Sequence, residues 1–77
     1  MSTDLINAAS YASDEIDIQL AEASRLLRSI PTKRTSMNVL VYPDLIPGQI
    51  DQVIRALIRA REIVLATDWR KARESEV

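Results

Sequence analysis

Carboxylates are the only conventional acid–base side chains that cluster in this sequence. Asp14, Glu15 and Asp17 lie within four positions, whereas histidine and cysteine are absent and Gly48 is the single glycine. General base catalysis would therefore fall to carboxylates, lysines or tyrosines, and disulfides and thiolate metal sites cannot form. A glycine-rich phosphate loop is also excluded. We interpret the acidic cluster as a solvated helix face, and we predict a non-enzymatic protein without cofactor or metal.

A basic segment follows the acidic one along the chain. Residues 1–24 carry acids and no base, whereas residues 25–34 carry four bases and no acid. The four bases are Arg25, Arg28, Lys33 and Arg34. A net charge of −1 gives the whole molecule no general attraction for nucleic acid. The basic segment is nevertheless the candidate contact for nucleic acid or a small anion, with a solvated basic loop as the alternative.

Arg61 and Asp68 are charged residues near the middle of the apolar side of a second helical pattern. Two interpretations of Arg61 stay open. It pairs with Asp14 or Asp17 across a helical hairpin, or it anchors an acidic group on a partner or a small anionic ligand.

Three large side chains lie off the predicted core. Tyr11 and Ile18 are seven residues apart on one side of the first helical pattern, and Trp69 lies near the end of the second. They either cap one end of a helical bundle or form part of a docking surface, because Trp, Tyr and Arg are the usual interface anchors.

Two helical segments must position these residues. Residues 4–30 repeat apolar side chains in steps of three and four, and Pro31 ends the pattern. In residues 47–73, the apolar side chains from Ile50 to Leu65 spread over about half of the helix circumference, which one facing helix cannot cover. The expected core face of the first helix is Leu5, Ala9, Ala12, Ile16, Leu20, Ala23, Leu27 and Ile30. We predict a mainly α protein, a single antiparallel two-helix hairpin domain over residues 1–77.

The connection between the helices contains one stretch with strand character. In SMNVLVYP, residues 39–42 are β-branched, aliphatic or aromatic, and Pro43 ends the run, which predicts a strand over 37–42. No second strand is available in the chain, and unpaired strand backbone is costly to bury. Pairing with the same strand of a second subunit is the arrangement we favour. An extended connector hydrated by water, or a short helix or irregular loop, is the alternative.

A strand that follows basic residues and precedes a helix resembles, in outline, the ribbon-helix-helix family of DNA-binding repressors. The resemblance covers about fifteen residues. It implies a dimeric ribbon in the major groove, with Asn38 able to read adenine beside Lys33 or Arg34. The chain departs from the family because a 27-residue helical pattern precedes the strand and no turn splits the second helix. Leu40 and Tyr42 are also poorly suited to face the groove.

Both the wide apolar arc and the lone strand predict a second subunit. A chain of 77 residues without disulfides has too small a core to be very stable alone. We therefore predict a dimeric helical bundle. Its predicted interface is Val39, Val41, Ile50, Ile54, Leu57 and Ile58.

These patterns favour a small homodimeric regulator or inhibitor that binds another protein stoichiometrically, of the kind that phage and plasmid genes encode. The predicted partner-binding residues are Tyr11, Ile18, Arg61 and Trp69. The alternatives are a ribbon-helix-helix-like repressor and a binder of a small anionic ligand at a subunit interface, and we rank nucleic acid below protein as a partner. The sequence lacks a signal peptide and an apolar run of about 18 residues, so we expect a cytoplasmic protein without membrane contact.

Overall fold

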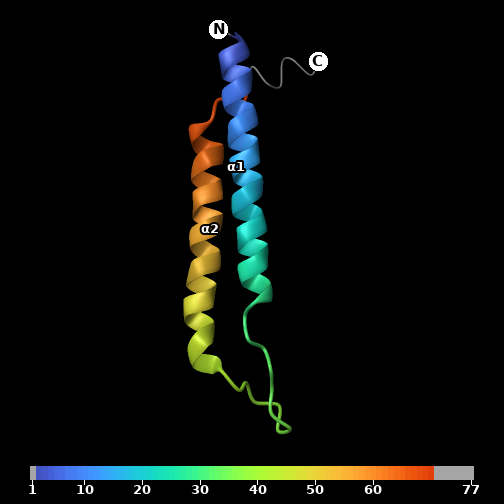
Figure 1. Ribbon diagram of the computed structural model, residues 1–77. Coiled ribbons are helices and arrows are strands. Elements are labelled where there is room, and N and C mark those ends of the chain that lie inside the picture. The colour runs from blue at the N-terminus through green and yellow to red at the C-terminus, as the bar shows by residue number, and fades with distance from the viewer. Residues whose placement is uncertain (1, 71–77) are drawn as a thin grey trace.

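Two antiparallel helices make up most of this chain (Figure 1). The computed structural model describes residues 2–70, with side chains described from residue 7 onward. Helix α1 spans Ser2–Arg28, a 3₁₀ turn η1 spans Pro43–Leu45, and helix α2 spans Ile46–Ala66. The molecule is a rod of 61 × 20 × 13 Å. The prediction of a mainly helical hairpin is confirmed.

The helix boundaries differ from those predicted, most of all at the end of α2. Pro43 and Pro47 lie at the starts of η1 and α2, where a missing N–H has no intrahelical partner to lose. Helix α2 ends at Ala66 rather than 73 because Thr67 is extended, with φ −97° and ψ 138°. The indole Nε1 of Trp69 donates to the carbonyl oxygen of Val64 at 2.9 Å and satisfies one terminal carbonyl. Residues 71–73 of the expected helix lie outside the described residues.

Side chains between α1 and α2 recur in alternating steps of three and four on both helices. On α1 these seam residues are Ala9, Ala12, Ile16, Gln19, Ala23 and Leu26. On α2 they are Ile46, Gln49, Val53, Ala56, Ala60 and Ile63. The average spacing of 3.5 residues is the heptad repeat of a coiled coil. We call this set of residues the seam.

The seam is narrow because most of its buried side chains are alanines. Among the residues whose side chains are described, the buried ones are Ala9, Ala23, Leu26, Ala56 and Ala60. Small side chains let the two helix backbones approach closely, since the distance between packed helices depends on the side chains at the contact. They also remove little apolar surface from water, at roughly 25 cal/mol per Å². The hairpin is therefore closely packed but buries only a small core.

The predicted core face of α1 is partly wrong. Ala9, Ala12, Ile16 and Ala23 do pack toward α2, and the side chain of Leu5 lies outside the described set. Leu20 and Leu27, however, are 45% and 59% exposed, and the adjacent Gln19 and Leu26 occupy the seam instead. Contact between the alanines of the two helices sets the rotation of α1, and this rotation turns both leucines to one side.

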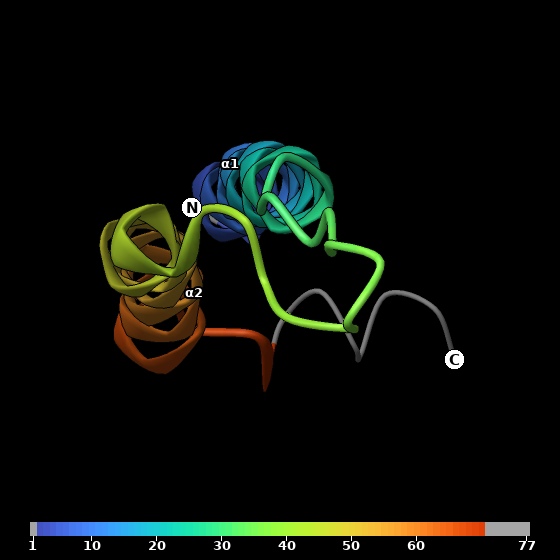
Figure 2. The ribbon, with the colours of Figure 1, turned by 90° about the horizontal axis from the view of Figure 1, so that it is seen from below.

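The expected strand over 37–42 is wrong, because the described residues contain only one isolated bridge, between Arg34 and Leu40. The connection folds on itself: the amide of Thr35 donates to the oxygen of Val39 at 2.8 Å. The turn closes at Asn38, whose φ of 63° is the left-handed conformation that asparagine tolerates better than most residues. Figure 2 shows the connection bending to one side of the helix pair. Backbone groups that we expected to pair between subunits find partners within the chain.

Candidate interaction surfaces

The seam divides the hairpin into two long faces. Each helix has one row of residues on either side of the seam. The first row directly follows every second seam residue, as Leu20 follows Gln19, and the second row directly precedes the remaining seam residues, as Glu22 precedes Ala23. Because the helices are antiparallel, like flanks of α1 and α2 lie on the same side of the hairpin. The first flank consists of Ser13, Leu20, Leu27, Ile50, Leu57 and Val64, which are aliphatic except for Ser13. The second consists of Ala8, Glu15, Glu22, Gln52 and Arg59, which are polar or charged except for Ala8. The hairpin therefore has one apolar face and one polar face.

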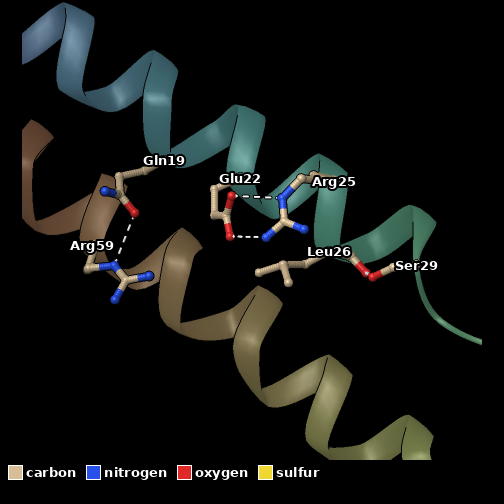
Figure 3. A network of polar contacts seen from close by, with 6 residues as sticks. All are labelled: Gln19, Glu22, Arg25, Leu26, Ser29 and Arg59. Carbon is tan, nitrogen blue, oxygen red and sulfur yellow. Dashed lines mark hydrogen bonds and ion pairs between the residues drawn. The ribbon is translucent and has the colours of Figure 1, made fainter.

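The polar face carries a hydrogen-bonded network that links the helices (Figure 3). Arg59 of α2 donates through Nε to Oε1 of Gln19 on α1 at 3.0 Å. Arg25 donates to Glu22 through two nitrogens, with Nε 3.0 Å from Oε2. Our sequence reasoning did not single out Gln19, Glu22 or Arg59. Their positions in or beside a heptad seam are the signal that would have identified them.

The Glu22–Arg25 contact changes the ionisation of both groups. The hydrogen bonds from Arg25 lower the pKa of Glu22 below its ordinary value, with smaller contributions from the charges of Arg25 and Arg59. The same hydrogen bonds raise the pKa of Arg25. The two side chains are 65% and 39% exposed, so the pair is well solvated and adds little stability. It mainly fixes the orientation of the Arg25 side chain.

No other part of the described chain covers the exposed apolar side of the hairpin, which we call the apolar face. We define it as Leu20, Leu27, Ile50, Ile54, Leu57, Ile58, Val64 and Leu65. Their exposure ranges from 42% for Val64 to 68% for Leu65. As expected from the width of the apolar arc on α2, one facing helix does not cover it. Exposed apolar surface of this extent is typical of interaction sites.

The residues predicted for the dimer interface fall into two groups. Ile50, Ile54, Leu57 and Ile58 all belong to the apolar face. The other two, Val39 and Val41, lie in the folded connection beyond the helix ends. The amide of Val41 donates to Lys33 O at 3.0 Å and the oxygen of Val39 accepts from Thr35, so neither group is free for an intersubunit ribbon.

The four predicted partner-binding residues lie on different surfaces. Tyr11 and Ile18, 76% and 58% exposed, point away from α2 on the outer side of α1. Arg61 lies among the α2 residues of the apolar face, and Trp69 packs against the end of α2.

The two charged residues singled out on α2 also behave differently from each other. Among the described residues Arg61 forms no ion pair with Asp14 or Asp17, although both carboxylates are on the facing helix. Asp68 accepts hydrogen bonds from the backbone and side chain of Arg70.

The basic segment is spread over the end of α1 and the connection. Arg25 is bonded to Glu22, and Arg34 Nη1 donates to Oδ1 of Asn38 at 3.1 Å. Arg28 and Lys33 are exposed. Asn38, which the ribbon-helix-helix resemblance would assign to adenine, is thus engaged within its own loop. No group of three or more acidic or other metal-ligating side chains converges among the described residues.

Across residues 2–70, neither helix combines the length and the apolarity needed to cross a membrane. No protein-family model matches the chain, and comparisons with curated proteins and with solved structures find no significant match. The interpretation of these surfaces therefore rests on their own geometry and chemistry.

Proposed function

We propose that this protein is a small non-enzymatic regulator or inhibitor, which acts as a homodimer by stoichiometric binding of another protein. The observation that carries the proposal is the exposure of Tyr11 and Ile18, one heptad apart on the outer side of α1. Large exposed side chains of these types cost solubility, and tyrosine is among the residues that anchor protein interfaces most often.

Arg25 extends this pair into a row on α1. It follows Ile18 by seven residues, so Tyr11, Ile18 and Arg25 share one side of the helix over about 21 Å. We call these three residues the outer row. Glu22 holds the guanidinium of Arg25, which reduces the side-chain entropy that Arg25 would lose on binding. A row of this length fits a groove or a single helix of the bound protein.

Acidic residues beside the outer row favour a particular kind of target. Asp14 and Glu15 flank it near Tyr11, and both are exposed. A complementary surface would present an apolar groove with a basic rim, because charges of opposite sign increase the association rate and fix the register.

Affinity capture with matched variants tests the proposal. The double substitution Tyr11→Ser/Ile18→Ser removes the aromatic and aliphatic anchors, whereas Met37→Ser removes an even more exposed apolar side chain from the connection. A protein retained by wild type and Met37→Ser, and lost with the double variant, would be purified for calorimetry. We expect one site per subunit and an affinity loss of about a hundredfold or more in the double variant.

Two results would contradict the proposal. One is a bound protein whose affinity is unchanged by the double substitution while the helical circular dichroism is intact. The other is salt-sensitive binding to DNA that Lys33→Ala/Arg34→Ala reduces, which would assign the function to the basic segment.

A further inference from the structure

We infer that a second copy of the chain covers the apolar face, in a four-helix bundle whose two-fold axis runs parallel to the helices. In this arrangement Asp17 of each protomer lies beside the partner's Arg61. The inference specifies the dimer within the proposed function, but it does not depend on the outer row or on the protein that the row binds.

The size of the apolar face matches what a specific dimer requires. Its eight aliphatic side chains are each about half exposed. Together they present apolar surface on the order of 700 Å² per protomer, close to the roughly 800 Å² per partner that a standard interface buries. The small alanine core stabilises the isolated hairpin only weakly, so burial of this additional apolar area would contribute a large share of the total stability.

The hairpin register places Asp17 and Arg61 at the same height. The hydrogen bond between Gln19 and Arg59 shows that these two residues are at the same height. Because the helices are antiparallel, Asp17, two residues before Gln19, is level with Arg61, two residues after Arg59. Asp17 precedes Leu20 by three residues and borders the apolar face on α1. Arg61 follows Leu57 by four residues and precedes Val64 by three, so it lies within the α2 part of that face.

Two symmetric arrangements could join two apolar faces. With the two-fold axis parallel to the helices, α1 packs on the partner's α2 and every residue keeps its height. Asp17 then faces the partner's Arg61, and the two opposite charges compensate each other. With the axis perpendicular to the helices, α1 packs on α1 and α2 on α2.

The perpendicular arrangement is unfavourable because of Arg61. If it is centred on Leu57, Arg61 lies level with the partner's Val53, beside the partner's Ile54, whereas Asp17 lies level with the partner's Arg25. Arg61 would then be buried among aliphatic side chains without a partner, which costs several kcal/mol. Charge complementarity therefore selects the parallel axis.

Side-chain size supports the same choice. At the height of Ser24 on α1, the facing α2 helix presents Ile54, so a small residue meets a large one. Alternation of small and large residues across facing positions is what closely packed helix layers require. The outer row points away from both neighbouring helices in this bundle and stays available to another protein.

Cysteine cross-linking in the full chain tests the geometry directly, because the protein has no cysteine of its own. We expect Asp17→Cys/Arg61→Cys to give a covalent dimer under mild oxidation, since disulfides form only between Cβ atoms about 4 Å apart. The control is Ser24→Cys/Arg61→Cys, which keeps the cysteine on α2 and moves the one on α1 by seven residues, to a height that does not match. Equal cross-linking in both variants, or none in the first, would overturn the arrangement.

A charge exchange provides the second measurement, and it does not depend on disulfide chemistry. Asp17→Arg and Arg61→Asp should each weaken dimerisation about tenfold or more, and the doubly exchanged variant should recover most of the loss. A double variant that dimerises no better than the weaker single variant would contradict the pairing. Loss of the outer-row target with an intact dimer would leave this inference standing while removing the proposed function.

Discussion

The orientation of each charged side chain on its helix determines which ion pairs form in this chain. Glu22 and Arg25 meet on the solvated side of α1, where their attraction is weak. One interpretation of Arg61 was a pair with Asp14 or Asp17 inside the hairpin. Arg61 lies level with Asp17 but among the α2 residues of the apolar face, and the two form no ion pair within the described chain. Charge distribution along the sequence predicted the height, but the rotation of each helix could not be deduced from it.

The pKa of Glu22 provides a test at this scale. Arg25→Gln removes the guanidinium that lowers this pKa, so we expect the Glu22 pKa to rise toward the ordinary value of 4.5. A carboxyl with a lowered pKa in the folded state stabilises the protein above its unfolded pKa, and this contribution disappears as pH falls through the folded pKa. NMR titration of the Glu22 side chain in both proteins measures the change, and superimposable titration curves would contradict the pair.

The alanine seam is the feature that organises the two helices. Strong apolar periodicity made the two helices and their antiparallel order predictable. The exact face was not, because sequence reasoning gave priority to Leu20 and Leu27 over the adjacent Gln19 and Leu26. Large residues are the usual core, but here the smallest residues decide how closely the helices approach. Leu20 and Leu27 remain exposed beside the seam.

The prediction for the connection failed for a different reason. Val39, Val41 and Tyr42 have high strand propensity, and propensity alone suggested a strand. Its backbone partners come from residues 33–35, directly before it, because Asn38 adopts the left-handed conformation that reverses the chain. Local turn chemistry therefore outweighed propensity.

Thr67 and Asp68 similarly mark the end of α2, where Asp68 caps the backbone N–H of Arg70 in an N-cap-like contact.

Enlarging one seam residue tests the packing of the helices. Ala56 has no exposed surface, so Ala56→Leu should force α1 and α2 apart and lower the free energy of unfolding by about 1–3 kcal/mol. The matched control is Ala21→Leu on the exposed side of α1, which should change it by less than about 0.5 kcal/mol. Urea unfolding at one protein concentration compares the two, and equal effects would show that the seam is not tightly packed.

At the scale of the whole molecule, the hairpin separates its surfaces by chemistry. On the polar face the hydrogen bond from Arg59 to Gln19 links the two helices, the apolar face remains uncovered, and the outer row shares Arg25 with the polar face. The sequence predicted an excess of apolar surface on α2 correctly. The position of the outer row relative to the apolar face required the structure, because it depends on the rotation that the seam imposes on α1.

Sedimentation equilibrium of the full chain, over a wide range of concentrations, tests the central claim that a second copy covers the apolar face. We predict a molecular mass of twice 8.7 kDa in wild type. Leu57→Asp places a carboxylate in the middle of the apolar face and should shift the protein to a single chain. A wild-type protein that retains its helical circular dichroism and sediments at 8.7 kDa at the highest concentrations would contradict the account.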